Sequence, residues 1–394
     1  MAVVQAIADR LARLAFPIED EHRLVRESAR AFARERLAPG AGERDETGAF
    51  PSALLGELAE LGLLAMKVPV ELGGAGTDNV GYVLAMEAIA EGCPSTCVIL
   101  ASSNLTAKIL ADHASPEQRQ RWLPAYAAGE LGPASFALTE PSGGSDAGAI
   151  TTTARRDGDG WVLDGSKMWI TSGAQAGLHL VFARTDPAAG RRGISCFVVE
   201  KGTPGLVVGA EEKKMGLRSS GTCALHFDGC RVGGDQLVGE PGAGYRIALG
   251  ALGAGRIGIA AQCIGIAEAA IAEGLAYSRD RVAFGQPLTE FQNTQFVLAD
   301  ARTQLDAAWL LALRAARLLD SGDPAKMESS MAKLAASEAC GRIVDAMLQL
   351  HGGYGYSREY PIERLYRDAR VTRIYEGTSE IQRIVIAREL LRDA

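Results

Sequence analysis

The sequence lacks several features that would assign it to large classes of protein. Its 394 residues include 41 Lys or Arg against 48 Asp or Glu, a net charge of −7, so the basic excess of a nucleic-acid-binding protein is missing. No run of about 18 uncharged apolar residues occurs, and we predict no membrane span. Hydrophobic residues at 47% and charged residues at 23% instead indicate a soluble globular protein, long enough for two or three domains.

Cysteine is also scarce: the chain has seven, an odd number, with no Cys-x-x-Cys pair. This pattern predicts reduced thiols in a cytoplasmic protein rather than a disulfide scaffold. Cys223, His226 and Cys230 lie close together, but Cys223 and His226 would point to opposite faces of a strand, so we predict no metal site. Residues 1–16 lack a secretory apolar stretch with a cleavage site, and we expect an amphipathic helix there.

The spacing of apolar residues changes twice along the chain. It is helical up to about residue 129, then becomes a series of short apolar segments typical of a β-sandwich or barrel, and is helical again after about residue 239. Because helices and strands are segregated, we predict an α+β protein with domains at 1–129, 130–238 and 239–394. Strands are expected at 161–171, 178–183, 194–199, 206–208 and 223–227, and long helices of a bundle at 257–277, 291–320, 326–350 and 379–392.

Two glycine motifs have a plain structural explanation. Residues 253–258, Gly-Ala-Gly-Arg-Ile-Gly, match the spelling of a dinucleotide-binding motif, but their flanks are helical. We interpret these glycines as small residues that let helices approach closely. Residues 143–145, Gly-Gly-Ser, resemble a nucleophile elbow, yet Ala147 replaces the second glycine and no strand leads into a helix there, which disfavours a serine hydrolase.

Two segments of the middle region suit a phosphate-bearing heterocycle. Residues 136–146 supply the hydroxyls of Thr139, Ser142 and Ser145 together with glycine N–H groups, which can cradle a phosphate. A polar turn before a strand is the alternative. Residues 169–171, Trp-Ile-Thr, place an aromatic plane beside a hydroxyl, an arrangement suited to a flat heterocycle.

The loop before the last predicted helix carries a candidate base. Glu376 precedes Gly377 and the last helix, and a carboxylate on a loop over a cleft can act as a general base. The alternative is a solvated loop glutamate. Ser379 with Gln382 fits a capping box that would start the last helix.

Together these fragments resemble the acyl-CoA dehydrogenases, most closely the short-chain, butyryl-type members. The resemblance covers the chain from about residue 18 and follows family order in segments 68–76, 136–146, 168–171, 215–220, 281–287, 349–355 and 374–382. It implies an N-terminal helical domain, a central β-domain and a C-terminal four-helix bundle. It also implies a homotetramer, built as a dimer of dimers, with FAD near the subunit interface.

The resemblance implies a role for particular residues in binding FAD. The flavin and pyrophosphate would be lined by Phe136, Leu138, Thr139 and Ser145, and the isoalloxazine covered by Trp169, Ile170 and Thr171. The cofactor of a neighbouring subunit would be reached by Arg281, Phe284, Gln292, Gln349, Gly352 and Gly353, while Thr378 and Glu380 would touch FAD beyond the catalytic loop. An arginine suits this task because guanidinium pairs well with pyrophosphate.

The resemblance also implies a reaction, the removal of two hydrogens across Cα–Cβ of an acyl-CoA thioester. Glu376 would take the α-proton while the β-hydrogen leaves as hydride to flavin N5, and electrons would pass on to an electron-transfer flavoprotein. Ser145, Arg256 and Gly377 would contact substrate. Some relatives carry the base just before the arginine matching Arg256; here that residue is Gly255, which favours Glu376.

One departure leaves the substrate open. The family often has an aspartate, associated with the thioester arm, where this chain has Gly253. An acyl group on a carrier protein therefore stays an alternative to acyl-CoA. An acyl-CoA oxidase or a flavin monooxygenase on the same fold would also fit these motifs. So would a non-catalytic protein that has kept the fold, although the retained Glu376 argues against it.

Overall fold

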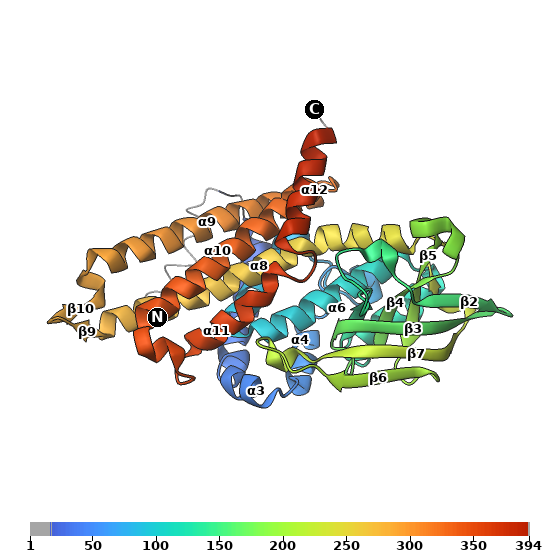
Figure 1. Cartoon of the computed structure of the whole chain (residues 1–394), viewed down its shortest axis with the longest axis horizontal. Coiled ribbons are helices and arrows are strands. Elements are labelled where there is room, and N and C mark those ends of the chain that lie inside the picture. The colour runs from blue at the N-terminus through green and yellow to red at the C-terminus, as the bar shows by residue number, and fades with distance from the viewer. Residues whose placement is uncertain (1–15, 17, 393–394) are drawn as a thin grey trace.

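The structure, a computed structural model, describes residues 16 and 18–392; the helix expected in residues 1–16 lies outside that part of the chain, apart from Phe16. A block of helices is followed by a sheet and then by longer helices. Figure 1 shows the sheet at one end of an elongated molecule and a small hairpin, β9 (Val282–Ala283) and β10 (Gln286–Pro287), at the other. Helix α8 (Gly244–Asp280) runs between these ends.

The N-terminal block is helical. It contains α2 (Asp20–Phe32), α3 (Ala41–Thr47), α4 (Ser52–Glu60), α5 (Asn79–Gly92), α6 (Pro94–His113) and α7 (Pro116–Ala127). The start of α7 is set by a reciprocal capping box, in which Ser115 Oγ accepts from Gln118 N and Gln118 Oε1 accepts from Ser115 N. Helices α5 and α6 are buried on nearly every side, so they form the centre of this block.

The middle block is one eight-stranded sheet. Its strands are β1 (Ala134–Ala137), β2 (Thr153–Asp157), β3 (Gly160–Thr171), β4 (Leu178–Arg184), β5 (Ile194–Glu200), β6 (Leu206–Glu211), β7 (Thr222–Val232) and β8 (Leu237–Val238). They run in the order β6-β7-β3-β2-β4-β5-β8, with β1 paired to β4. Most neighbours are antiparallel, but β1 and β2 both pair with β4 in parallel.

The sheet curls around its own core. Trp161 of β3 and Phe197 of β5 are three strands apart in the sheet order, yet their ring centroids lie 5.5 Å apart. Three steps across a flat sheet would span about 14 Å, because neighbouring strands are about 4.8 Å apart. The strong curvature agrees with the sandwich or barrel predicted for this region. Cys223 faces the core and His226 is exposed, as strand alternation predicts.

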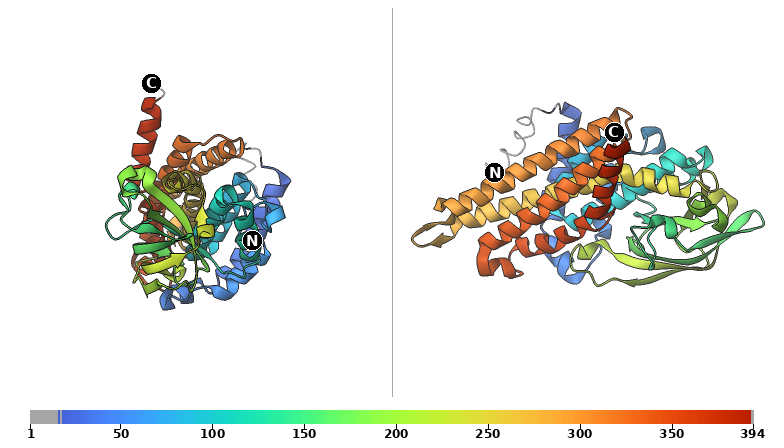
Figure 2. Two further views of the ribbon diagram at one scale, coloured as in Figure 1. Left: turned by 90° about the vertical axis from the view of Figure 1, so that its right-hand side faces the viewer. Right: turned by 45° about the horizontal axis from the view of Figure 1, so that its top comes forward.

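The C-terminal block is a bundle of long helices. Besides α8 it contains α9 (Gln292–Asp320), α10 (Lys326–His351), α11 (Pro361–Arg370) and α12 (Ser379–Arg392). Figure 2 shows α12 leaving the bundle and pointing away from the rest of the molecule. In the part of the chain that the structure describes, α8 is the one helix long and apolar enough to cross a membrane by composition, and 72% of that apolar window is buried inside the protein.

The predicted helices agree with the structure except at α8 and α11. Helix α8 begins at Gly244 rather than near 257, because the glycines between 250 and 258 interrupt the apolar period that marks a helix. The short, charge-rich α11 is absent from the sequence-based prediction. The seven cysteines are all buried and carry free thiols.

Candidate active site

Glu376 lies on the loop that leads into α12. The preceding Tyr375 anchors this loop, since its hydroxyl donates to Gln262 Oε1 in the centre of α8. Gln262 is itself fully buried and donates to the carbonyl of Pro94 at the start of α6 (2.9 Å). The loop is therefore tied to both helical blocks.

The capping box predicted at Ser379 is wrong. Ser379 Oγ donates to Glu338 Oε1 of α10 (2.7 Å) and does not cap the helix. Thr378 caps it instead, because Thr378 Oγ1 accepts from Ile381 N (3.4 Å). Gln382 turns back toward the loop, where Nε2 donates to the carbonyls of Glu376 (3.2 Å) and Gly377 (2.8 Å).

The carboxylate of Glu376 points into the protein. Its Oε2 is buried without a hydrogen-bond partner. A Cβ at Gly255 of α8 would lie 3.0 Å from this oxygen and 3.3 Å from Leu105 Cδ1, so the absent side chain at Gly255 gives the carboxylate its space. Gly258, one turn on, similarly receives the hydroxyl of Tyr82. Both positions are packing glycines as predicted, but nothing lies within 4 Å of a Cβ at Gly253, which is therefore not one.

The electrostatics of the site are dominated by burial and by three cations. Burial raises the pKa of Glu376 to about 7, although Lys333, Arg256 and Lys67 each act to lower it. Arg256 donates to Ser330 Oγ (2.8 Å) and keeps a buried Nε without a partner. Lys333 donates to the carbonyl of Gly377 (2.8 Å). Of the predicted substrate contacts, Arg256 and Gly377 thus lie in the surroundings of Glu376, whereas Ser145 lies on an exposed loop of the middle block.

The predicted flavin-covering segment sits on a distorted strand. Strand β3 shifts its register against β7 between Lys167 and Ile170, and Trp169 within this bulge has a positive φ of 62°. The bulge turns Trp169 outward, so that its side chain is 56% exposed while Ile170 packs into the core of the sheet. Any contact of Ile170 with a ligand therefore runs through its backbone.

A buried ion pair joins the two predicted flavin segments. Lys167 Nζ donates to Glu140 Oε1 (2.7 Å) and to the carbonyl of Leu138 (3.1 Å), and both charged side chains are almost completely buried. Glu140 also accepts from the backbone of Thr151 (2.6 Å) and Thr152 (3.0 Å). Burial acts to raise the pKa of Glu140, but Lys167 and these hydrogen bonds outweigh it and bring the value to about 2.

Around the loop of residues 136–146, side chains and backbone remain accessible. Thr139 and Thr171 are half-buried and Ser145 is exposed, while the ring of Phe136 packs 5.0 Å from that of Phe182. Nothing lies within 4 Å of a Cβ at Gly143. A ligand could therefore approach this backbone closely, as the phosphate-binding interpretation requires.

The remaining predicted cofactor residues lie at the opposite end of the molecule. Arg281, Phe284 and Gln292 are exposed at the β9–β10 hairpin and the start of α9, and Gln349, Gly352 and Gly353 are exposed at the end of α10. Arg281 stacks on Tyr354 (5.8 Å), and Phe284 is 97% exposed with a positive φ of 50°. Thr378 and Glu380 stay beside Glu376. Figure 1 shows that, within one chain, the hairpin and the sheet lie at opposite ends of the long helices.

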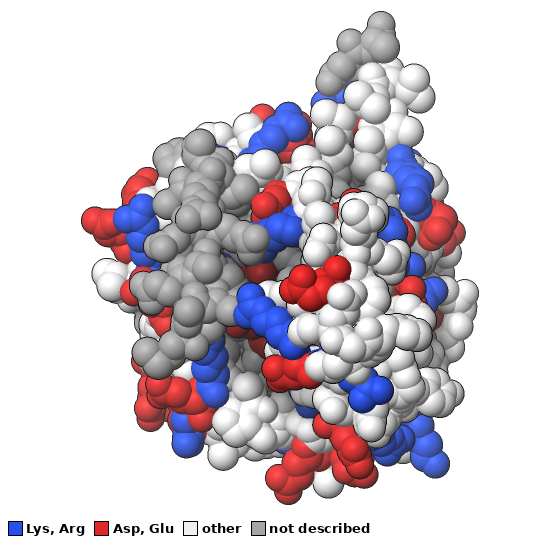
Figure 3. Space-filling model, turned by 90° about the vertical axis from the view of Figure 1, so that its left-hand side faces the viewer, with Lys and Arg blue, Asp and Glu red and all other residues white. Residues whose placement is uncertain are grey.

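Figure 3 views the hairpin end of the molecule. On the part of this face that belongs to the described residues, acidic and basic side chains are interspersed, and uncharged surface lies between them. Phe284, Tyr354 and Tyr356 are large exposed side chains of this region. These groups fit a ligand that carries an aromatic ring and a diphosphate. The exposed aromatic side chains can pack against the ring, and Arg281 can pair with the diphosphate. The backbone at Gly352 and Gly353 is open to a ligand, because nothing lies within 4 Å of a Cβ there.

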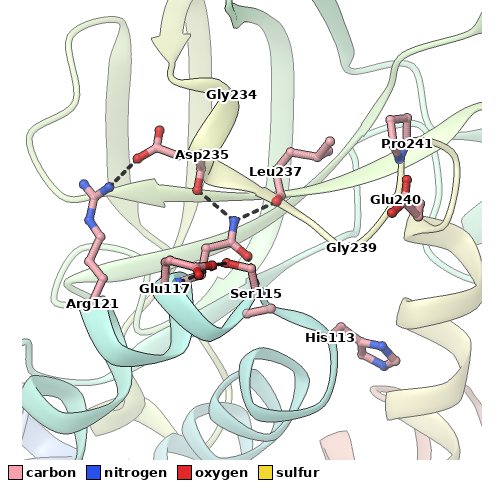
Figure 4. A pocket seen from close by; sticks show the side chains of 12 residues that line it. His113, Ser115, Glu117, Arg121, Gly234, Asp235, Leu237, Gly239, Glu240 and Pro241 are labelled. Carbon is pink, nitrogen blue, oxygen red and sulfur yellow. Dashed lines mark hydrogen bonds and ion pairs between the residues drawn. The ribbon is translucent and has the colours of Figure 1, made fainter.

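A separate groove of about 640 Å³ lies between α7 and β8 (Figure 4). Its polar groups bind one another: Gln118 Nε2 donates to the carbonyls of Asp235 and Leu237 (2.7 Å each), and Arg121 pairs with Asp235 (2.7 Å). The lining includes none of the predicted site residues. We interpret this groove as a junction between the N-terminal and middle blocks.

Comparison with known proteins decides the family. Models of the N-terminal, middle and C-terminal domains of acyl-CoA dehydrogenases match residues 19–130, 135–230 and 242–391. The chain belongs to the acyl-CoA dehydrogenase family. Its members bind FAD, and they are oxidoreductases that act on CH–CH donors.

Individual relatives agree over nearly the full length. The mitochondrial short-chain specific acyl-CoA dehydrogenase of Rattus norvegicus is 48% identical over 95% of this chain and 91% of its own. Butyryl-CoA dehydrogenase from Megasphaera elsdenii is 39% identical with a TM-score of 0.93, covering 96% of this chain and 100% of that one. A chain in the structure of the electron transferring flavoprotein of Acidaminococcus fermentans is 40% identical with a TM-score of 0.94 at the same coverage. A glutaryl-CoA dehydrogenase from Mycobacterium smegmatis, in complex with FADH2, is 32% identical with a TM-score of 0.91, covering 96% of each chain.

Sequence reasoning missed Lys333, Gln382 and the Glu140–Lys167 pair. A signal for Lys333 is present, because it falls in phase with Ser329, Ala336 and Cys340 on the buried stripe of α10. A charge on such a stripe indicates a buried partner, but the sequence alone does not say which.

Proposed function

We propose that this chain dehydrogenates a short- or branched-chain acyl-CoA thioester to the trans-2-enoyl thioester with FAD, and that Glu376 is the base. The observation that carries the proposal is the carboxylate of Glu376, whose inward Oε2 is buried without a partner. Burial raises its pKa to about 7, which makes it a stronger base than an exposed glutamate. An α-proton beside a thioester is weakly acidic, so a strong base is what the reaction requires.

The surroundings of Glu376 suit the charge that develops when the α-proton leaves. Negative charge would appear on the thioester oxygen, where Arg256 and Lys333 contribute positive potential in a buried site. The N–H of Glu376 has no acceptor among the described residues and is free to donate to that oxygen. FAD, when bound, supplies the chemistry that accepts the β-hydrogen as hydride. Trp169 and Thr171 would hold its flavin, with Ser145 and the backbone around Gly143 at its pyrophosphate.

The test is anaerobic bleaching of the bound flavin by butyryl-CoA. We expect rapid loss of the yellow absorbance, with a rate that rises with pH through a midpoint near 7, because the base must be deprotonated. A protein that binds FAD but is not bleached by any acyl thioester would contradict the proposal. Fast peroxide formation by the reduced enzyme in air would identify an oxidase instead.

A second candidate substrate is an acyl group on a carrier protein. It is favoured by Gly253, which has open space in place of the carboxylate that the family often presents to the thioester arm. Bleaching should therefore be compared between matched acyl-CoA and acyl-carrier thioesters. A preference for the carrier form would replace acyl-CoA as the substrate.

The separation of the cofactor residues supports an assembly in which a neighbouring copy completes each FAD site. We propose that this assembly is the homotetramer, a dimer of dimers, that the resemblance implies. Arg281 and Phe284 lie too far along α8 to serve a flavin held by Trp169 of the same chain, so a neighbour would supply them. Substituting Arg281 by Ala should then lower FAD content while leaving the fold intact. The similarity to a chain in the electron transferring flavoprotein structure supports such a flavoprotein as the electron acceptor. Reduction of that acceptor by the substrate-reduced enzyme would test this step.

A further inference from the structure

The catalytic loop has a strained backbone. Glu376 has a φ of 50° and Gly377 a φ of 90°, so two consecutive residues are left-handed. Glycine accepts this conformation freely, but a glutamate does not. A non-glycine residue stays left-handed only where surrounding contacts enforce it. The contacts that enforce it here should therefore matter for the direction in which the Glu376 side chain points.

Two side chains hold the carbonyls of this strained turn. Lys333 Nζ, from α10, and Gln382 Nε2, from α12, both donate to the carbonyl of Gly377 at 2.8 Å. Gln382 also donates to the carbonyl of Glu376 at 3.2 Å. Together they hold the two peptide groups on either side of Gly377, one of which joins it to Glu376.

Lys333 is an unusual residue to find in this position. Its side chain is 0% exposed, and within the described residues no carboxylate lies within ion-pairing distance of its ammonium. A buried lysine is rarely left without an anionic partner. Glu338, the acidic neighbour on the same helix, is engaged by Arg373 (3.6 Å) and by Ser379 (2.7 Å). The Gly377 carbonyl is the one hydrogen-bond acceptor of Lys333 in the part of the chain described.

We propose that Lys333 is a positioning residue for the base: its ammonium holds the Gly377 carbonyl so that Glu376 stays left-handed, with its carboxylate directed at the face of Gly255. The inference rests on the proposed function for the identity of the base. Lys333 also adds positive potential to the site, and this second effect must be separated from the first. The charged or titratable groups that act on Glu376 from the packed elements are Lys67, Tyr82, Arg256, Lys333 and Tyr375.

The chain offers variants that separate geometry from charge. Lys333→Met removes both the hydrogen bond and the charge. Gln382→Leu removes the hydrogen bonds to the carbonyls of Gly377 and Glu376 but no charge. Lys67→Met removes a charge only, since the Lys67 ammonium stacks on Tyr82 (4.5 Å) and makes no hydrogen bond to the loop among the described residues.

The measurement is the limiting rate of flavin bleaching by butyryl-CoA as a function of pH, in the FAD-loaded protein. We expect Lys333→Met to lower the plateau rate at least tenfold and to move the midpoint to higher pH. Gln382→Leu should lower the plateau without moving the midpoint. Lys67→Met should move the midpoint upward and lower the plateau less than Lys333→Met does. A Lys333→Met variant whose plateau matches that of Lys67→Met would overturn the positioning role.

A second readout does not depend on turnover. Hydrogen–deuterium exchange over residues 374–382 should become faster in Lys333→Met and Gln382→Leu, and stay unchanged in Lys67→Met. If the parent protein is not bleached by any thioester yet the loop loosens in this pattern, the proposed function fails while the positioning inference stands. If Lys333→Met does not fold, Gln382→Leu provides the test. Unchanged exchange in that variant would refute the idea that hydrogen bonds to the Glu376 and Gly377 carbonyls hold the loop.

Discussion

The middle and C-terminal blocks each bury one lysine beneath a functional loop, and they treat its charge in opposite ways. Lys167 is paired with Glu140, which in turn is saturated by backbone donors, so the charge beneath the flavin segments is neutralised within the protein. Among the residues that the structure describes, Lys333 beneath the catalytic loop has a backbone carbonyl as its one hydrogen-bond acceptor and no carboxylate partner. Both lysines hold a backbone carbonyl, that of Leu138 in one case and that of Gly377, which follows the strained Glu376, in the other.

The difference follows from what each loop has to do. A loop that only holds a flat cofactor benefits from a closed network, because a fully satisfied buried pair is rigid and carries no net charge. A loop that must stabilise a developing negative charge benefits from uncompensated positive charge nearby. Under the proposed function, the same residue type would serve as a fixed support in one block and as a source of positive potential in the other.

Removing the Glu376 carboxylate, which the cations Lys333, Arg256 and Lys67 surround, should have the largest effect on the rate of flavin bleaching. Glu376→Gln keeps the size of the side chain but removes the base, and we expect bleaching by butyryl-CoA to slow by about 1,000-fold or more. The FAD content should be unchanged, measured from the absorbance ratio of the purified protein. Near-parental bleaching in this variant would refute Glu376 as the base.

Breaking the paired lysine should mainly cost stability. Lys167→Met leaves Glu140 charged, buried and unpaired, which we expect to lower the free energy of unfolding by about 3–5 kcal/mol in a denaturant titration. The double variant Glu140→Gln with Lys167→Met should recover part of this loss. The matched control is Arg231→Ala, which breaks the exposed Arg231–Asp157 pair of the same sheet and should cost less than about 1 kcal/mol. Equal losses in the two single variants would contradict the role of burial.

The space that Gly255 leaves beside the Glu376 carboxylate can be tested by adding one methyl group there. Gly255→Ala places a Cβ 3.0 Å from Glu376 Oε2, so the carboxylate must move, and we expect bleaching to slow about tenfold. Gly250→Ala, in the same helix but with nothing within 4 Å of its Cβ, is the control. Both variants should gain some helix stability, because alanine is favoured over glycine by up to about 1 kcal/mol. A rate loss shared by both would show that helix flexibility, and not the space beside Glu376, sets the rate.

The smallest effect is expected at a third buried charge, where the blocks meet. Asp368 of α11 accepts a hydrogen bond from Leu217 N (2.6 Å), and burial raises its pKa to about 7. The folded protein thus holds a proton that the unfolded chain loses near pH 4, so stability falls as pH rises from about 4 to 7. Asp368→Asn should remove this loss and raise the melting temperature at pH 8 by a few degrees. The melting temperatures of the two proteins should converge near pH 4; a constant difference at all pH values would exclude titration of Asp368 as the cause.

The sequence predicts best where the decisive contact is local. The start of α7 at Pro116 follows from adjacent residues and is confirmed by the structure. The strands predicted at 161–171 and 178–183 are observed as Gly160–Thr171 and Leu178–Arg184, within one residue at each end. Strand β2, Thr-Ala-Arg-Arg-Asp, escapes prediction because only one of its five residues is buried, so it has no apolar alternation to detect.

The parts of the site that escape prediction depend on partners far away in the sequence. Lys167 meets Glu140 across 27 residues, and Lys333 meets Gly377 across 44. The local pattern predicts that Ser379 caps the last helix, but its hydroxyl instead donates to the carboxylate of Glu338, 41 residues away. Glu376 itself is identifiable through its family motif, while the burial that raises its pKa depends on the packing of the N-terminal and C-terminal helical blocks.

Helix α8 has a consequence for how the chain can vary in length. It is 37 residues long without a break, about 55 Å at 1.5 Å per residue, and carries Arg256 beside Glu376 and Arg281 just beyond its far end. Inserting or deleting one residue between them would rotate one arginine by about 100° relative to the other. Seven inserted residues would nearly restore the angle but lengthen the helix by about 10 Å. The stretch between the two arginines therefore has to keep a fixed length and helical phase, both of which an insertion or a deletion would change.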